Sequence, residues 1–118
     1  MADLIKLIHN GCFIARFIAT WEELDNETAT NEQSTTKSYY SHSVENNFTH
    51  IISSNKKVIN LCVSIETCTG LAWDMWKRAC DARNLPTDIC TTFTTSGTVM
   101  NPKVTVSPPT EHVSQHII

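Results

Sequence analysis

Short runs in which apolar and polar residues alternate limit most strongly what this chain can fold into. Side chains of a β-strand point alternately to its two faces, so alternation with a period of two predicts a strand buried on one side. Runs of this kind, or runs rich in Thr and other β-prone residues, occupy 4–9, 13–24, 48–53, 57–65, 88–97 and 103–106. Turn residues separate them about every ten residues, a spacing typical of an all-β sandwich.

Two of these runs predict which side chains are buried. In 13–24, the residues expected on one face are Phe13, Ala15, Phe17 and Ala19. In 57–65, the expected inward residues are Ile59, Leu61, Val63 and Ile65, and the expected outward ones are Val58, Asn60, Cys62 and Ser64.

The connections are predicted from turn chemistry. Asn10-Gly11 is the dipeptide that a tight hairpin prefers, because both residues tolerate positive φ, so a hairpin is expected between 4–9 and 13–24. The polar segment 25–43 is expected as exposed loop or edge strands, and 77–84, closed by Pro86, as the one helical turn. A turn is expected at 97–102. The chain of 118 residues is predicted to be a single domain, 1–118, with 107–118 a flexible tail.

Composition excludes several kinds of function. The formal net charge of −3 lacks the basic excess that binding to a nucleic-acid backbone requires. The N-terminus has no signal-peptide pattern, and no apolar run reaches the roughly 20 residues of a spanning helix. We therefore expect a soluble protein, cytoplasmic or released by a non-classical route, whose contact with membranes would be peripheral.

Neither a metal site nor catalysis is predicted. The five cysteines show no CxxC spacing, and their odd number favours reduced thiols over a disulfide framework. The histidines lack partners at catalytic or metal spacing and are expected as surface or loop residues; they are His9, His42, His50, His112 and His116. Glu22 and Glu23 are expected to be solvated rather than to act as a glycosidase pair. We expect no enzyme, no cofactor and no metal.

The stretch TCTGLAWDMWK, Thr67 to Lys77, holds two of the three tryptophans. Trp73 and Trp76 are either part of the core or held at the surface to enter something apolar. Indole suits a membrane boundary because it combines an apolar body with one N–H donor. Cys68 is either a buried structural thiol or an accessible one.

This stretch closely resembles the Trp-rich undecapeptide of the cholesterol-dependent, or thiol-activated, cytolysins, which lies in their C-terminal membrane-binding domain. The motifs HNGCFIARFIATWEEL, NFTHII, NLCVSIE and GTVMNP are similar to other landmarks of that domain and follow in the same order. The resemblance covers about Ile5 to Val106. It implies a compact sandwich of two antiparallel sheets, with the Trp-rich loop and other loops at one tip. It also implies binding to membrane lipid, with cholesterol as the candidate sterol.

Departures from the family pattern modify these expectations. Thr67 stands where the family has Glu, Met75 where it has the middle Trp, and Lys77 where it has the closing Arg. Val99-Met100 replaces the sterol-sensing Thr-Leu pair and removes a hydroxyl, so reduced selectivity for cholesterol is expected. Nothing in the chain corresponds to the family's pore-forming domains, so we expect no pore from this chain alone.

The resulting hypothesis is a peripheral membrane-binding module. The expected membrane- or sterol-binding residues are Cys68, Thr69, Gly70, Leu71, Ala72, Trp73, Asp74, Met75, Trp76, Lys77, Val99 and Met100. The expected supporting tip loops contain Asn10, Gly11, Cys12, Phe13, Glu45, Asn46, Asn47 and Phe48. The main alternative is a lectin-like module that binds a glycan or protein receptor through the same loops. A third is a module that docks a pore-forming partner protein or competes with it. The sequence leaves the oligomeric state open.

Overall fold

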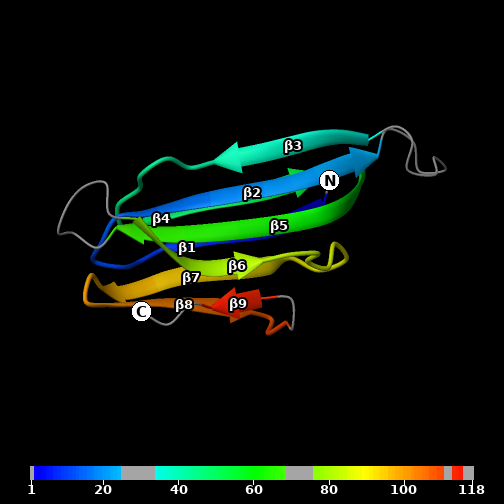
Figure 1. Cartoon of the computed structure of the whole chain (residues 1–118). Coiled ribbons are helices and arrows are strands. Elements are labelled where there is room, and N and C mark those ends of the chain that lie inside the picture. The colour runs from blue at the N-terminus through cyan, green and yellow to red at the C-terminus, as the bar shows by residue number, and fades with distance from the viewer. Residues whose placement is uncertain (1, 25–33, 69–75, 111–112, 116–118) are drawn as a thin grey trace.

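The computed structural model describes residues 2–24, 34–68, 76–110 and 113–115. These residues form nine strands arranged as two packed sheets (Figure 1). The four-stranded sheet has the order β4 (Phe48–Ser54), β1 (Ala2–His9), β7 (Thr91–Thr98), β8 (Asn101–Ser107). The five-stranded sheet has the order β3 (Ser34–Tyr40), β2 (Ala15–Leu24), β5 (Lys57–Cys68), β6 (Trp76–Ala82), β9 (Val113–Gln115). The predicted all-β sandwich is confirmed.

One strand pair departs from the expected antiparallel sheets. β1 and β7 run parallel, with Ile5 opposite Thr91 and His9 opposite Thr95, whereas the other paired strands are antiparallel. Among the described residues, no helix is long and apolar enough to cross a bilayer.

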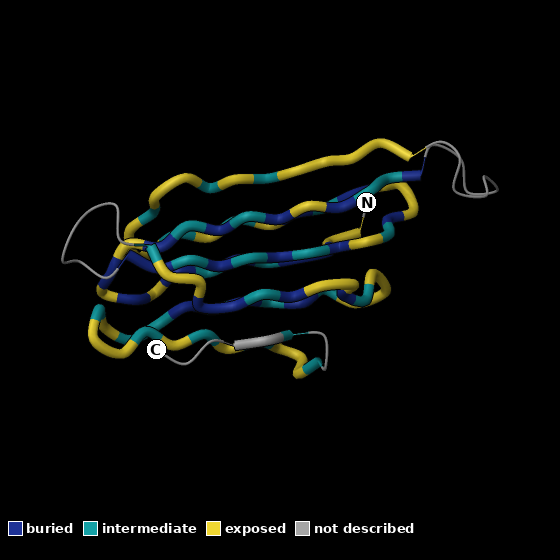
Figure 2. The backbone as a smooth tube through the Cα atoms, in the orientation of Figure 1, coloured by how far each residue is buried: buried dark blue, intermediate teal, exposed yellow. Residues whose placement is uncertain are grey.

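The core lies between the sheets and follows the predicted alternation of β2. Ala15, Phe17 and Ala19 are fully buried, and Phe13 is nearly so, as the sequence predicts. They pack against inward residues of the other strands, which include Ile5, Leu7, Leu61, Ile65 and Phe93. Buried and more exposed positions alternate along β2 and β5, whereas β3 is largely exposed (Figure 2).

The predicted hairpin at Asn10-Gly11 is wrong, because β1 and β2 belong to different sheets. After β1 the chain continues alongside β7: the Asn10 N–H donates to the Thr95 carbonyl at 2.8 Å, and the Cys12 N–H donates to the Gly97 carbonyl at 2.9 Å. It then crosses to the second sheet, where β2 begins at Ala15. The segment 10–14 therefore joins the two layers of the sandwich instead of reversing within one.

The predicted helical turn at 77–84 is also wrong, since Trp76–Ala82 is strand β6. A β-bulge explains why the sequence hides this strand. The register with β5 shifts between Ile65 and Glu66, whose partners are Cys80 and Arg78, so Ala79 is an extra residue and both Ala79 and Cys80 are buried. Two consecutive inward residues interrupt the alternation on which a strand prediction depends.

A second bulge corrects the predicted faces of β5. The register with β2 shifts between Thr20 and Glu22, and Asn60 has a φ of 54°. Val58 is therefore buried, contrary to prediction, whereas Leu61, Val63 and Ile65 are inward as predicted and Ile59 is only half-buried. The extra residue reverses the alternation on its N-terminal side.

The β7–β8 turn agrees with the sequence prediction, whereas part of the C-terminal tail differs from it. β7 and β8 join through Val99 and Met100 with Thr98 opposite Asn101, which confirms the predicted turn. Gly97 has a φ of 93°, and a Cβ there would collide with the Asn101 carbonyl, so the hairpin needs glycine. In the expected flexible tail, Val113–Gln115 pairs with β6 as β9, so this part of the tail is a sheet strand.

Candidate functional site

The loops that the sequence predicts at one tip lie at the same end of the sandwich. We call it the tip and define it as residues 10–14, 41–47, Cys68, Trp76–Lys77 and 98–101. Strand pairings bring these residues to the same end: His9 lies opposite both Phe48 and Thr95, and Cys68 lies opposite Trp76. Figure 1 shows the β7–β8 turn and the ends of β5 and β6 at this end. The predicted residues Thr69, Gly70, Leu71, Ala72, Trp73, Asp74 and Met75 lie outside the described residues.

Main-chain hydrogen bonds fix the segment 10–14 to both sheets. Besides the two bonds to β7, the Cys68 N–H donates to the Ile14 carbonyl at 2.9 Å, and Ala15 and Val44 exchange N–H···O bonds of 3.1 and 2.8 Å. Cys12 and Ile14 are exposed on the outside of this segment. These hydrogen bonds therefore hold the end of β5, the crossing segment 10–14 and the 41–47 loop together at the tip.

His9 lies beneath the tip and is fully buried, which corrects the expectation of a surface or loop histidine. Its Nε2 lies 2.6 Å from the Phe13 carbonyl, and since a carbonyl only accepts, Nε2 carries the proton. Its Nδ1 lies 2.6 Å from the Thr95 hydroxyl, and its ring centroid is 4.8 Å from that of Phe13. Burial lowers the pKa of His9, and the hydrogen bond to Phe13 offsets this only in part. Its spacing from Ile5 and Leu7 could have predicted the inward position.

The two supporting loops come together around an open hollow of about 330 Å³. Its lining residues are Gly11, Cys12, Phe13, Ile14, Glu45 and Asn46. A Cβ at Gly11 would collide with the Phe13 ring, so glycine allows that ring to fold inward under the loop. The hollow combines the apolar residues Phe13 and Ile14 with the polar residues Glu45 and Asn46.

The predicted supporting residues differ in what they contact. Phe13 and Phe48 belong to or pack against the core, and the Phe48 ring stacks on that of Phe17 with centroids 5.7 Å apart. Asn10, Glu45, Asn46 and Asn47 are exposed, and Asn47 has a φ of 67°. The two phenylalanines thus hold the loops in place, and the polar residues are the ones that reach solvent.

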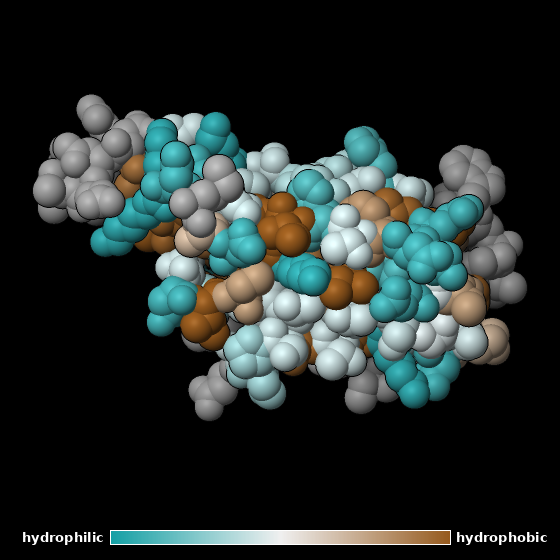
Figure 3. Space-filling model, turned by 180° about the vertical axis from the view of Figure 1, so that it is seen from behind, coloured by the Kyte–Doolittle hydropathy of each residue, from teal (hydrophilic) through white to brown (hydrophobic). Residues whose placement is uncertain are grey.

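The β7–β8 turn separates its two predicted residues. Val99 packs against the core, whereas Met100 is 92% exposed, the largest value among the exposed large hydrophobic residues of the described chain. On the outer face of the four-stranded sheet, apolar side chains are scattered among polar ones (Figure 3). Met100 is therefore the apolar side chain that the described part of the tip presents most fully to its surroundings.

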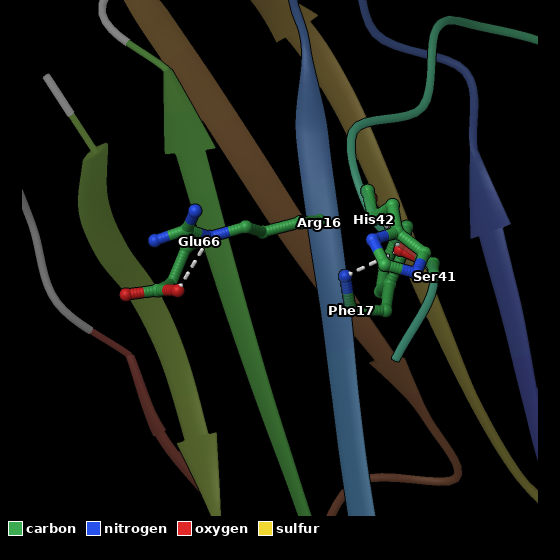
Figure 4. A network of polar contacts seen from close by, with 5 residues as sticks. All are labelled: Arg16, Phe17, Ser41, His42 and Glu66. Carbon is green, nitrogen blue, oxygen red and sulfur yellow. Dashed lines mark hydrogen bonds and ion pairs between the residues drawn. The ribbon is translucent and has the colours of Figure 1, made fainter. Parts of the chain in front are cut away.

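Trp76 is the first residue of β6 and is half-buried. The Arg16 guanidinium lies over its ring, with Cζ 4.1 Å from the centroid, and Arg16 Nε donates to Glu66 Oε1 at 2.7 Å (Figure 4). Burial alone would lower the pKa of Arg16, but the hydrogen bond and charge of Glu66, with a contribution from Tyr40, raise it. The sequence analysis missed Arg16 and Glu66, because 50 residues separate them and only the β2–β5 register brings them together.

The cysteines in and near the tip differ in how far they are buried. Cys68 is buried at the end of β5, Lys77 is exposed, and none of the five cysteines forms a disulfide. Burial and the nearby Asp81 raise the pKa of Cys80 to about 11, which makes it a poor nucleophile at neutral pH. No cluster of three His, Cys, Asp or Glu side chains that could hold a metal ion occurs in the described ranges.

Comparison with solved structures places this geometry in a known group. The membrane-binding domain of pneumolysin superposes with a TM-score of 0.78 at 29% identity, covering 93% of this chain and 100% of that one. A pneumolysin structure described as that of a sugar-binding protein gives a TM-score of 0.78 at 30% identity, covering 92% of this chain and 24% of that one.

Sequence comparison agrees. Tetanolysin from Clostridium tetani is 32% identical over 104 residues, which cover 86% of this chain and 20% of tetanolysin. The chain thus spans about a fifth of the length of this relative. The family model described as the thiol-activated cytolysin beta sandwich domain matches residues 4–103. The chain therefore belongs to the family of thiol-activated cytolysin β-sandwich domains.

Proposed function

We propose that this chain is a peripheral membrane-binding module that contacts lipid through the tip. The observation that carries the proposal is the gathering of the tip loops at one end of a sandwich that matches the membrane-binding domain of pneumolysin over its full length. Met100 supplies a fully exposed apolar side chain at that end. Burying a side chain of this kind is worth about 1.5–3 kcal/mol, enough for weak, reversible attachment when other tip residues contribute.

The residues of the β7–β8 turn support the proposal that membrane binding depends only weakly on cholesterol. Val99 carries no hydroxyl and packs against the core, so it offers no hydrogen bond to a sterol 3-OH. Met100 is unbranched and flexible, and it can fill irregular spaces between acyl chains. Binding should therefore depend mainly on loose lipid packing and less on the sterol.

The packing of the core supports the further proposal that this chain attaches to membranes without forming a pore. The inward faces of both sheets build one shared core, so a strand could leave the sandwich to enter a bilayer only by exposing that core. We expect this chain alone to bind vesicles and to leave them sealed.

The test is co-sedimentation with phosphatidylcholine vesicles over a series of cholesterol contents, with dye release measured in parallel. Binding at all sterol contents, rising gradually, with no release of dye is the expected result. Dye release at protein concentrations where the chain co-sediments would contradict the absence of pores. Failure to bind any vesicle would contradict the proposal itself.

The hollow beside Gly11 favours one alternative, which is glycan binding. The side chains of Glu45 and Asn46, which line it, offer hydrogen-bond partners for sugar hydroxyls, and a pneumolysin structure is described as that of a sugar-binding protein. A glycan array with wild type and Asn46→Ala separates the two functions. A glycan bound by wild type and lost in Asn46→Ala, without vesicle binding, would establish the alternative.

A further inference from the structure

A row of charged side chains crosses the outer face of the five-stranded sheet just behind the tip. Arg16 on β2 pairs with Glu66 on β5, and Glu66 pairs in turn with Arg78 on β6. Directly opposed residues of antiparallel strands project from the same face with Cβ atoms about 5 Å apart, so Arg16 and Arg78 stand on either side of Glu66 on that face. Lys77, next to Arg78, lies opposite Thr67 on the other face of β6 and is exposed because it is at the tip end of the strand. We call these four residues the basic row.

The charge of the basic row is opposite to that of the chain. Its three cations and one carboxylate give a formal charge of +2, whereas the whole chain has −3. Exposed charges act over about 8 Å at physiological ionic strength, so the row presents a local positive field despite the acidic chain.

Arg16 is held in a fixed position within the row. Its Nε donates to Glu66 at 2.7 Å, and its plane lies over the Trp76 ring at 4.1 Å. The contact with Glu66 engages the Nε donor, and Figure 4 shows the two terminal nitrogens of the guanidinium on the side away from Phe17. A guanidinium carries five N–H donors in a rigid fork that matches the oxygens of a phosphate, and fixing it beforehand lowers the entropy cost of binding.

The row lies at the depth of lipid headgroups if the tip meets a bilayer. Glu66 is two residues from Cys68, and Arg78 is two residues from Trp76, so the row stands about 7 Å behind the tip end of these strands. The headgroup layer on each side of a bilayer is about 5–8 Å thick. Apolar insertion of the tip would thus leave the basic row among the phosphates and not in the hydrocarbon.

From this arrangement we propose that the basic row is a binding site for the phosphate groups of anionic phospholipids, with Arg16 and Arg78 as its forks and Lys77 as an added charge. The proposal rests on the proposed membrane function and names the lipid class that the tip prefers. Glu66 positions Arg16, and its carboxylate keeps the row from attracting anions strongly before the tip meets a membrane.

The test compares two vesicle compositions: phosphatidylcholine with cholesterol, and the same mixture with a fifth of the phosphatidylcholine replaced by phosphatidylserine. The variant is Lys77→Gln with Arg78→Gln. The matched control is Lys57→Gln with Arg83→Gln, which makes the same change in net charge at exposed positions far from the tip, at the first residue of β5 and directly after β6. Each cation near an anionic surface is worth about fivefold in affinity, so the tip variant, which lacks two, should lose about 25-fold on phosphatidylserine vesicles and little on neutral ones.

Each outcome decides one point. The proposal gains support if the tip variant loses the preference for phosphatidylserine and the control variant keeps at least half of it. Equal losses in both variants would assign the preference to net charge and overturn the site. Binding to neutral vesicles with no gain from phosphatidylserine would overturn the site and leave the membrane function standing. Absence of binding to every vesicle would overturn both.

A competition arm identifies the source of the phosphate. Inorganic phosphate is added to the phosphatidylserine vesicles, with sodium chloride at equal ionic strength as the comparison. Equal, modest weakening by both salts is expected for a site that reads phosphate in a membrane. Specific displacement by millimolar inorganic phosphate would assign the row to free phosphate and overturn the lipid assignment.

Discussion

Replacing Trp76 by alanine should destabilise the fold as well as weaken membrane binding. The ring is half-buried, and half of a tryptophan's roughly 200 Å² at about 25 cal/mol per Å² gives about 2.5 kcal/mol. The cation–π contact with Arg16 adds about 0.5–1 kcal/mol at a solvent-accessible site. The sum of about 3 kcal/mol corresponds to a fall in Tm of at least about 12 °C for a domain of this size.

The assay is urea and thermal unfolding followed by far-ultraviolet circular dichroism, since fluorescence would change with the tryptophan itself. Arg16→Met and the Arg16→Met, Trp76→Ala double variant complete a cycle whose coupling energy should be about 0.5–1 kcal/mol. Lys77→Ala, at an exposed neighbouring position, is the control and should leave Tm within about 2 °C. An unchanged Tm for Trp76→Ala together with weaker vesicle binding would refute this reasoning and return Trp76 to the role of an exposed anchor that the sequence favoured.

Three further predictions concern His9 and the β7–β8 turn. Because burial lowers the pKa of His9 below its unfolded value of 6.5, the unfolded state takes up the proton first, so the free energy of unfolding should fall as pH drops below about 6.5. Urea unfolding of His9→Gln at pH 5 and 7 should show a weaker pH dependence and a loss of about 1–2 kcal/mol at pH 7. Met100→Ser should leave Tm unchanged and weaken vesicle binding by about 1.5–3 kcal/mol, and a lowered Tm would show that Met100 packs on the fold. Val99→Thr with Met100→Leu should steepen the dependence of co-sedimentation on cholesterol content; a sharp cholesterol threshold already present in wild type would contradict the argument from the missing hydroxyl.

Local alternation was enough to predict the core face of β2 but not the partners of the strands. Phe17 and Ala19 are inward as predicted, because burial on one face needs only the period of two. The hairpin at Asn10-Gly11 failed, because the same dipeptide can also begin a crossing between sheets. What decides between the two is the pairing of Asn10 and Cys12 with β7, more than 80 residues later in the chain. Pairing over such a distance leaves no local mark in the sequence.

Which tip residues face outward was likewise only partly predictable. The motif resemblance predicts the loops, and the structure brings those of the described residues together at one end. The resemblance alone does not distinguish Met100, which is exposed, from Val99, which packs inward. It also does not show that Phe13 and Phe48 support the loops from beneath. These differences depend on how each turn closes against the core.

The bulge at Ala79 shows how one residue decides the chemistry beside the tip. Ile65 pairs with Cys80, and without the bulge Glu66 would face Ala79 and Arg78 would face Thr67, whose side chain is buried. A one-residue slip sends every following side chain to the other face, so Arg78 would take the position opposite Thr67 that Lys77 now holds and would leave the face of Glu66 and Arg16. With Ala79 as the extra residue, Arg78 instead lies outward opposite Glu66, in line with Arg16. The interruption that concealed β6 in the sequence is therefore what brings Arg78 into line with Glu66 and Arg16, and deleting Ala79 should remove the bulge while keeping Arg78 opposite Glu66.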